Sequence, residues 1–409
     1  MGKVFNITKR NSFILFLLAT CFIMLMVDIF IYCFTDIYSS VIRVDTGYYA
    51  YLPALFLHNF DFSFSFLNDT SDFLVQNVNR YPIGVAICWL PFWLVGHCIY
   101  LLAGIQDTGY GNVHQIMVLI SGIFYWAVGI TCTYKILLKK FDKKVSLVSC
   151  VLITYGTRLF YYSTIDAALS HVYSFALIAI LGWCFISYIE QRNALKVFIC
   201  GILLGLITDI RNVNIIVAII PLVYLGVSCI EKKRKVSTAL KDLLLAAVGT
   251  FIGFFPMMLY WKIASGSWVY NSYGQWSFDW LHPHAIQTLF GEDSITGMIK
   301  LSPILLLIIP GFVLMYRNYR SKLVTLAILV CLMVDLYLIF CCWAPAGLGR
   351  RNYINFLSII AFAFAYVIDW KEKDIKHNAN YNIALNVFCF AAVTWNILEM
   401  IHYCFYWEI

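Results

Sequence analysis

Long apolar blocks constrain this chain more than any other feature of its sequence. The run from Phe13 to Phe34 covers 22 residues, and about 20 apolar residues suffice for a helix to cross roughly 30 Å of hydrocarbon. Apolar residues make up 62% of the chain and charged residues 12%, where soluble domains average about 25% charged. A soluble fold could not bury this much apolar surface. The sequence therefore predicts an all-α, polytopic membrane protein.

We expect about 11 membrane-spanning helices in a single transmembrane domain, 1–409. The expected spans are 13–34, 113–134, 145–162, 172–189, 196–208, 213–230, 242–261, 299–316, 323–342, 353–369 and 382–405. The first apolar run is too long for the core of a cleaved signal peptide, and no A-x-A-like site follows it, which favours an uncleaved signal-anchor.

The basic residues indicate which side each loop faces. With the N-terminus in the cytoplasm, 21 of the 29 Lys and Arg residues fall on inner segments, as the positive-inside rule requires. These are Lys3, Lys9, Arg10, Lys135, Lys139, Lys140, Lys143, Lys144, Arg192, Lys196, Lys232, Lys233, Arg234, Lys235, Lys241, Arg317, Arg320, Lys322, Lys371, Lys373 and Lys376. The remaining eight fall on or near the outer side: Arg43, Arg80, Arg158, Arg211, Lys262, Lys300, Arg350 and Arg351.

One further segment, 82–104, is long enough to span the membrane, but a crossing there would invert every later basic cluster. We therefore expect it to pack into the outer leaflet with both ends outside, and Pro91 near its middle favours a break. The stretch from Tyr48 to Leu57 is expected to form a shorter helix of the same kind. Two large outer loops result, at 35–112 and 262–298.

Several function classes find no support in the sequence. The net charge of +7 comes from basic residues spread over the loops, where they indicate which side of the membrane each loop faces. Nothing in the sequence resembles a nucleic-acid-binding motif. The 14 cysteines contain no CxxC, which gives neither a zinc site nor a disulfide framework. Walker A, Rossmann and HExxH patterns do not occur.

Asp45 and Asp166 are the two acidic candidates on the outer side. Asp45, in RVDTGYYAYLP, could accept a proton from an attacking hydroxyl, hold a divalent metal through oxygen, or cap the following helix. Asp166, in YYSTIDAALSHVYSF, precedes Ser170 and His171 by four and five residues, about one turn of a shared helix. That spacing predicts a carboxylate, a hydroxyl and an imidazole close together, although Asp166 or Ser170 as a simple cap is equally consistent.

Two groups of outer residues could contact a phosphate. Asp209, Arg211 and Asn212 lie in the turn of GLITDIRNVN, where either a local salt bridge or a turn reaching into a cavity would account for them. Arg350 and Arg351, in APAGLGRRNY, run against the charge bias. Paired guanidinium groups suit bidentate phosphate binding, although contact with lipid headgroup phosphates would also explain them.

These outer-side residues match the needs of a lipid-linked phosphosugar: cations for phosphate, a carboxylate for the acceptor hydroxyl, and polar or aromatic groups for sugar. The layout resembles the GT-C integral-membrane glycosyltransferases, which use polyprenyl-phosphate sugars. The resemblance rests on Asp45 after the first span, on RYPIGVAICWLPFWL as a juxtamembrane stretch, on YYSTIDAALSH and on GILLGLITDIRNVN. It covers most of residues 10–360, with short and degenerate motifs.

The resemblance implies a GT-C-like architecture and a role for each candidate residue. Asp45 and Asp166 match the family's two acidic positions and become the candidate catalytic carboxylates. Donor-phosphate binding is assigned to Arg350, Arg351 and Arg211, and binding of sugar or acceptor to His171, Tyr48, Ser170 and Asp209. Because no second acidic residue adjoins Asp45, no metal ligand is assigned, and dependence on Mg²⁺ or Mn²⁺ stays open.

The expected activity is transfer of a hexosyl residue from a polyprenyl-phosphate-linked donor to a glycan or lipid-linked acceptor. In size and plan the chain is similar to serotype-converting O-antigen glucosyltransferases. This similarity implies a bacterial inner-membrane protein with a periplasmic active site, whose partners are donor, acceptor and membrane lipids, without nucleic acid. Two alternatives remain: a polysaccharide polymerase or ligase, and a lipid-linked-sugar flippase or transporter, which Asp28 and Asp335 within spans would suit.

Overall fold

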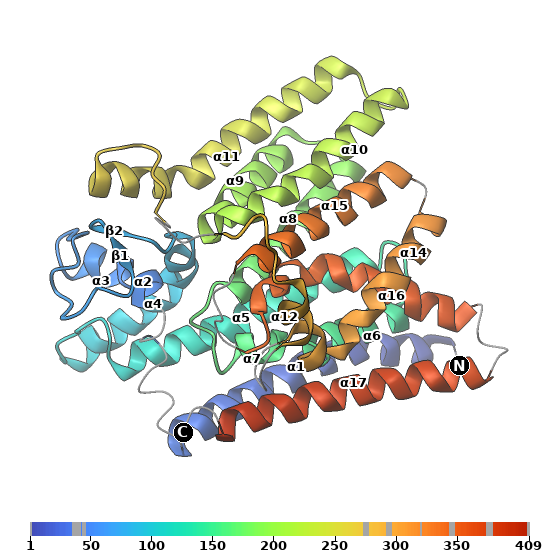
Figure 1. Ribbon diagram of the computed structural model, residues 1–409, viewed down its shortest axis with the longest axis horizontal. Coiled ribbons are helices and arrows are strands. Elements are labelled where there is room, and N and C mark those ends of the chain that lie inside the picture. The colour runs from blue at the N-terminus through green and yellow to red at the C-terminus, as the bar shows by residue number, and fades with distance from the viewer. Residues whose placement is uncertain are drawn as a thin grey trace.

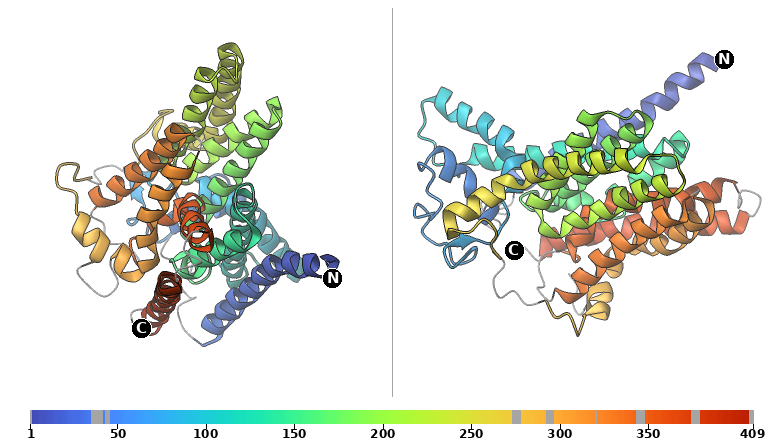
Figure 2. Two further views of the ribbon diagram at one scale, coloured as in Figure 1. Left: turned by 90° about the vertical axis from the view of Figure 1, so that its right-hand side faces the viewer. Right: turned by 90° about the horizontal axis from the view of Figure 1, so that it is seen from above.

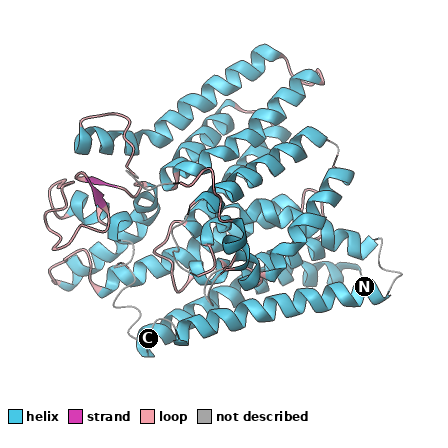
Figure 3. Ribbon diagram, in the orientation of Figure 1, coloured by secondary structure: helices cyan, strands magenta, loops and turns pink. Residues whose placement is uncertain are grey.

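The chain folds almost entirely into helices, as the computed structural model shows (Figure 3). The structure describes residues 2–34, 42, 46–272, 278–291, 297–319, 321–342, 348–373 and 379–406. Within these ranges the one sheet is a two-stranded antiparallel ribbon, β1 (Leu74–Val75) with β2 (Val78–Asn79). The all-α membrane architecture predicted from the apolar blocks is confirmed.

The helices are labelled in chain order (Figure 1). The first half of the chain contains α1 (Gly2–Phe34), α2 (Thr46–Tyr49), α3 (Tyr51–Phe56), α4 (Gly84–Ala103), α5 (Asn112–Leu137), α6 (Lys143–Tyr155), α7 (Leu159–Ser163), α8 (His171–Glu190) and α9 (Ala194–Ile210). The second half contains η2 (Asn212–Ala218), α10 (Ile219–Ile230), α11 (Val236–Ser265), α12 (Ala285–Phe290), α13 (Met298–Leu301), η3 (Pro303–Leu307), α14 (Ile308–Asn318), α15 (Lys322–Cys341), η4 (Arg351–Phe356), α16 (Leu357–Lys373) and α17 (Ala379–Tyr406).

Among the described residues, nine helices are long and apolar enough to cross a membrane. Eight of them coincide with expected spans, and the ninth is α4, from the 82–104 segment that was expected not to cross. Each of the 11 expected spans coincides with helical structure, but 196–208 and 299–316 form shorter apolar helices, α9 and the η3–α14 unit. The expectation of one continuous helix over 145–162 is wrong. The chain leaves α6 at Gly156, a poor helix former, and the buried Arg158 side chain donates hydrogen bonds to the carbonyls of Leu301 and Asn396.

The basic clusters gather at one end of the helical bundle, on the right in Figure 1, where the N-terminus lies. Ion pairs join neighbouring loops there, such as Lys139 with Glu190 at 2.7 Å and Lys144 with Glu372 at 3.0 Å. We call this the basic end. The opposite end, which we call the loop end, holds α2, α3, the β1–β2 ribbon and α4 (Figures 1 and 2). This separation is the one that the positive-inside rule predicts.

The position of α4 bears on whether 82–104 crosses the membrane. Its first residue, Gly84, abuts the last turn of α9, so closely that a Cβ there would lie 2.4 Å from the carbonyl carbon of Asp209. From this point α4 runs antiparallel to the N-terminal half of α5: Tyr125 donates to the carbonyl of Cys88 at 3.2 Å, and Gly96 abuts His114. Both ends of α4 therefore lie toward the loop end, and α5 alone continues to the basic end.

A histidine–aspartate cluster holds α4 to the start of α5. Asp107 contacts His97 Nδ1 at 2.6 Å and His114 Nε2 at 2.9 Å, and the Trp93 ring stacks on both imidazoles. Burial opposes ionisation of Asp107, but hydrogen bonds with His97, the Gly109 N–H and His114 outweigh it, so the pKa of this carboxyl lies below its usual value. The cluster fixes the α4–α5 connection as a folded unit.

Helices α9 and α11 pack backbone against backbone through glycines spaced four residues apart. A Cβ on Gly201 would lie 2.2 Å from the carbonyl oxygen of Ala246, and one on Gly253 would lie 2.2 Å from that of Ile202. Gly205 and Gly249 are equally enclosed. This is the small-xxx-small packing by which membrane helices approach closely, and it sets the position of the α9 C-terminus.

Candidate functional site

A polar cluster forms at the loop end where α8, the α9–η2 turn and η4 meet. Nη1 of Arg211 lies 3.2 Å from Nδ1 of His171 and donates a hydrogen bond of 2.8 Å to Oδ1 of Asn352. Arginine can only donate, so Nδ1 of His171 is the acceptor in this contact. Three segments separated widely in sequence therefore converge on one guanidinium group.

Buried amides and a hydroxyl extend this cluster into the protein. Oδ1 of Asn355 also lies 3.1 Å from Nδ1 of His171. An amide oxygen can only accept, so it pairs with His171 in the tautomer that carries a proton on Nδ1, and the contact from Arg211 belongs to the other tautomer. Nδ2 of Asn355 donates to Oδ1 of Asn214 at 3.4 Å. The Asn214 Nδ2 group donates to Ser174 Oγ at 2.9 Å. All four side chains are buried. Because buried polar groups require partners, this network fixes the orientation of the His171 ring.

Local backbone structure explains why these side chains meet. Helix α9 ends at Ile210, and the backbone of its C-cap residue, Arg211, is extended. Gly349 and Arg350 adopt positive φ angles of 77° and 51° before η4 begins at Arg351. A bend of this kind is strained for arginine, and it places Arg351, Asn352 and Asn355 on the turn that faces α8.

The two adjacent arginines are placed differently. Arg350 is buried, and Arg351 is half-buried with its guanidinium carbon 5.9 Å from the centre of the Tyr162 ring. The Tyr162 hydroxyl donates to the carbonyl of Leu348 at 2.9 Å, and the ring packs edge-on against His171. Tyr162 thus connects Arg351 to the Arg211–His171 contact.

Asp166 lies beside this cluster but not on a helix. Residues 164–170 form turns, and α8 begins only at His171. The expectation that Asp166, Ser170 and His171 share one helix is therefore wrong. The Thr164 backbone, at φ −122° and ψ −90°, ends α7, and the Tyr173 hydroxyl holds the turn by donating to the Ala167 carbonyl at 2.8 Å. Asp166 is half-buried and lies within electrostatic range of Tyr162.

Asp45 lies outside the described residues, so its candidate role stays a prediction. Tyr48, soon after it, is buried, with its ring 4.5 Å from that of Tyr81. Ser170 is the N-cap residue of α8 and is also buried.

Asp209 occupies the opposite face of the α9 terminus from Arg211. It is fully buried, and neither carboxylate oxygen has a hydrogen-bond partner among the described residues. Its carboxyl group lies within electrostatic range of the Tyr51 phenol, and its backbone abuts Gly84. The local salt bridge with Arg211 considered from the sequence is absent from this part of the structure, since Arg211 contacts His171 and Asn352 instead.

Sequence reasoning missed several members of the cluster. Asn214, Asn352 and Asn355 stand within or next to apolar spans, a setting that itself marks functional polar residues. Asp335 was noted as a charge within a span; it is buried in α15 and lies within electrostatic range of Arg211.

The cluster offers a set of cations facing the loop end, with amide donors and a nearby carboxylate. Among the described residues no group of three or more His, Cys, Asp or Glu side chains could hold a metal ion. Asp45, a candidate ligand, is not among them. The arrangement can bind an anion through Arg211 and Arg351 and can accept a proton at Asp166.

Comparison with known proteins identifies a solved structure with a similar fold. No protein-family model matches the chain, and no curated protein matches it. The structure is similar to that of the Archaeoglobus fulgidus oligosaccharyltransferase in its apo form, with a TM-score of 0.55 and 12% sequence identity over 96% of this chain. The match covers 56% of that oligosaccharyltransferase, so the chain spans little more than half of its length. The GT-C-like architecture expected from the sequence is confirmed by this likeness.

Proposed function

We propose that the chain is a membrane glycosyltransferase that moves a hexosyl residue from a polyprenyl-phosphate-linked donor to a glycan or lipid-linked acceptor. The observation that carries this proposal is the convergence of Arg211, His171 and Asn352 at the loop end of a fold similar to an oligosaccharyltransferase. In our proposal the loop end faces the periplasm of a bacterial inner membrane, and the acceptor is an O-antigen-like glycan.

Arg351, Arg350 and Arg211 bind the donor phosphate in this proposal. When the sugar leaves, negative charge builds on the phosphate oxygens, and fixed cations stabilise that change. Arg211 is held in place by His171 and Asn352, so it needs no rearrangement to meet the developing charge. Arg351 lies against Tyr162 and supplies a second guanidinium group.

A carboxylate acts as general base in the transfer step. The acceptor hydroxyl oxygen forms a bond to the anomeric carbon, the bond from that carbon to the phosphate oxygen breaks, and the hydroxyl proton passes to the carboxylate. Asp166 and Asp45 are the two candidates. Asp166 supports this role by its place beside Tyr162 and the arginine cluster, while Asp45 is proposed on sequence grounds. His171, Tyr48, Ser170 and Asp209 are proposed to shape the sugar and acceptor pocket.

The test is a transfer assay with purified full-length protein in defined lipid. Polyprenyl-phosphate-linked hexoses and a diphosphate-linked glycan are supplied as alternative donors, with and without EDTA followed by added Mg²⁺ or Mn²⁺. We expect transfer from the monophosphate-linked donor, and loss of that transfer in the Asp45→Asn variant or the Asp166→Asn variant. Transfer from the diphosphate-linked donor alone would instead identify a polymerase or ligase. No transfer from either, together with movement of donor between leaflets, would identify a flippase.

A further inference from the structure

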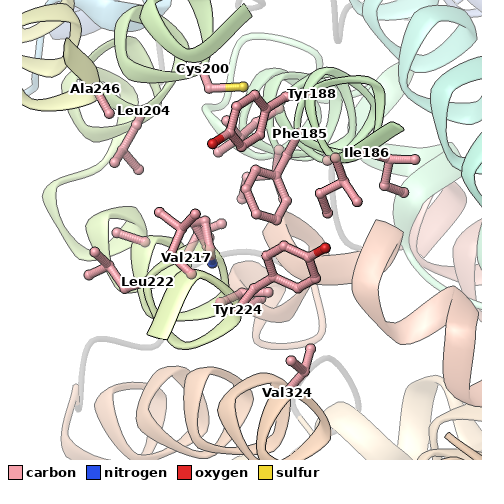
Figure 4. Close-up of a pocket in the computed structure, with 18 of the residues that line it drawn as sticks. Phe185, Ile186, Tyr188, Cys200, Leu204, Val217, Leu222, Tyr224, Ala246 and Val324 are labelled. Atoms are coloured by element: carbon pink, nitrogen blue, oxygen red, sulfur yellow. The ribbon is translucent and has the colours of Figure 1, made fainter. Parts of the chain in front are cut away.

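An apolar cavity lies between helices in the half of the bundle nearer the basic end, away from the cluster described above. Its volume is about 550 Å³. Figure 4 shows Leu204, Val217 and Phe185 projecting into it from α9, η2 and α8. Aliphatic and aromatic side chains form nearly all of its wall, so it suits a hydrocarbon chain and offers little to a polar ligand.

A second cavity, of about 700 Å³, lies at the basic end around the α10–α11 loop. The cationic residues that line it are Arg192, Lys232, Lys233, Arg234 and Lys235. Lys233 pairs with Glu231. The backbone of Lys232 has a positive φ of 54°, a sparsely populated conformation for a residue with a side chain. It reverses the chain after α10, and the N–H groups of Lys233 and Arg234 both bond to the Ser228 carbonyl.

Arg234 joins the two cavities. It lines the basic cavity, and its Nη1 donates a hydrogen bond of 2.7 Å to Oδ2 of Asp242 and another to the Tyr188 hydroxyl. Tyr188 and Asp242 in turn line the apolar cavity. The Arg234 side chain is 2% exposed, and its Nε has no partner among the described residues. A buried donor without a partner is costly, so this N–H is available to an anionic group at the junction.

We propose that the two cavities form one binding site for an anionic phospholipid from the leaflet at the basic end. The phosphate headgroup occupies the basic cavity, where it meets Lys232, Lys235 and the junction at Arg234. An acyl chain extends past Tyr188 into the apolar cavity. Basic pockets between membrane helices on the cytoplasmic side recognise lipid headgroups in this way. The site is separate from the proposed transferase centre and does not depend on it.

The positive charge of the basic cavity and the shape of the apolar cavity together favour an anionic phospholipid over other ligands. Free phosphate would use the lysines but leave the apolar cavity without a ligand. A zwitterionic phospholipid would fill the apolar cavity, but its own cation would oppose the lysines. Only a lipid that carries net negative charge matches both parts.

Binding can be measured by native mass spectrometry of the full-length protein in detergent. Palmitoyl-oleoyl-phosphatidylglycerol is titrated against palmitoyl-oleoyl-phosphatidylcholine, and inorganic phosphate is added as a competitor. We expect phosphatidylglycerol to bind at least about tenfold more tightly than phosphatidylcholine, and millimolar phosphate to leave that binding unchanged. Equal binding of the two lipids would overturn the proposal, and so would displacement of the lipid by phosphate.

Variants separate the two halves of the site. Lys232→Gln with Lys235→Gln removes two exposed charges and should weaken phosphatidylglycerol binding about tenfold. The matched control, Lys143→Gln with Lys373→Gln, removes two exposed charges from other parts of the basic end, the first turn of α6 and the last turn of α16, and should bind normally. Leu204→Trp fills the apolar cavity and should abolish the preference. Wild-type binding by either site variant would contradict the assignment.

Crosslinking to the wild-type protein tests the same site without relying on variants that could misfold. Phosphatidylglycerol with a diazirine near the end of one acyl chain is photo-crosslinked to the wild-type chain in vesicles, and the labelled peptides are mapped. We expect labels on the walls of the apolar cavity, in 200–204 and 217–225. Labels confined to the outer surfaces of α1 and α17 would show that the cavity is not occupied.

Discussion

Nη1 of Arg211 donates a 2.8 Å hydrogen bond to Asn352, the residue that follows Arg350 and Arg351 in the chain. This bond ties the end of α9 to the start of η4, so the three arginines that stood out in the sequence belong to one part of the molecule.

Arg351→Ala should lower the rate of sugar transfer by about 10²–10³-fold, since one fixed donor to the developing charge is lost. Arg351→Lys should retain part of the rate, because lysine keeps the charge without the planar fork. Rates are measured at saturating acceptor with purified protein in defined lipid. The control is Arg80→Ala, which removes another loop-end arginine, one that lies over Tyr81 and should transfer normally. A mild loss at Arg351 that is restored by changing the lipid would mean a headgroup contact.

His171 should act as a positioning residue for Arg211. The His171→Gln and Arg211→Lys variants should each slow transfer, and the double variant should be little slower than the worse of the two. Residues in contact typically show coupling of about 0.5–3 kcal/mol in such a cycle. The cycle is measured on kcat/KM for donor, and additive effects would show that the 3.2 Å contact has no functional role.

Asp166→Asn should lower transfer by about 10²–10⁴-fold if this carboxylate is the general base. A general base works only when it is deprotonated, so the kcat/KM of the wild-type protein should fall as the pH is lowered. The kcat/KM of the variant should not show this fall. Asp69→Asn is the matched control, because Asp69 is an exposed carboxylate in the loop after α3 that bonds only locally to Ser71. If Asp166→Asn keeps full activity while Asp45→Asn loses it, the base is Asp45.

Acid should remove the stabilising contribution of Asp107. Its pKa in the folded protein lies below the ordinary value of 3.8, so the contribution is fully present above about pH 5. It is lost as pH falls through the lower, folded-state pKa. We expect Asp107→Asn to lower the unfolding temperature at pH 6 to 7, and the difference from wild type to shrink below about pH 3.8. Thermal unfolding followed by tryptophan fluorescence gives both values, and a difference that grows with acid would contradict the assignment.

Arg158 should be needed for the chain to fold. Its guanidinium donates to the carbonyls of Leu301 and Asn396, which lie in distant parts of the chain. Removing a buried donor leaves such carbonyls unpaired at about 1–3 kcal/mol each. Arg158→Met should therefore lower the unfolding temperature and the yield of folded protein, as measured by size-exclusion chromatography. Arg317→Met at the basic end is the control, since Arg317 lies near the end of α14.

Much of the fold was accessible from the sequence because lipid imposes simple demands. Apolar length predicts spans, and basic residues predict which ends lie together, as the shared basic end of the bundle confirms. The break at Gly156 was not predicted, because residues 145–162 are apolar enough for one helix. Just after the break, the Arg158 side chain donates to carbonyls more than 140 positions away in the sequence. Contacts of that kind have no local signature.

The candidate site could be predicted only in part. Arg211, Arg351 and His171 were recognisable as polar residues at the outer ends of spans, and the structure brings them into one cluster. Asn214 and Asn355 carry no charge and follow no spacing rule, so their place in the network depends on how α8, η2 and η4 pack. Asp166 was expected on the helix of His171, but the backbone turn at Thr164 separates them.

The glycine contacts between α9 and α11 have a mechanical consequence. With backbones touching at Gly201, Gly205, Gly249 and Gly253, no side-chain layer is left between the two helices to absorb sliding or rotation. We therefore expect the two helices to move as one rigid unit, with Arg211 at the C-terminal end of α9. If the site changes shape as donor enters and product leaves, the movement must come from the opposite wall, from η4 and the turn before α8.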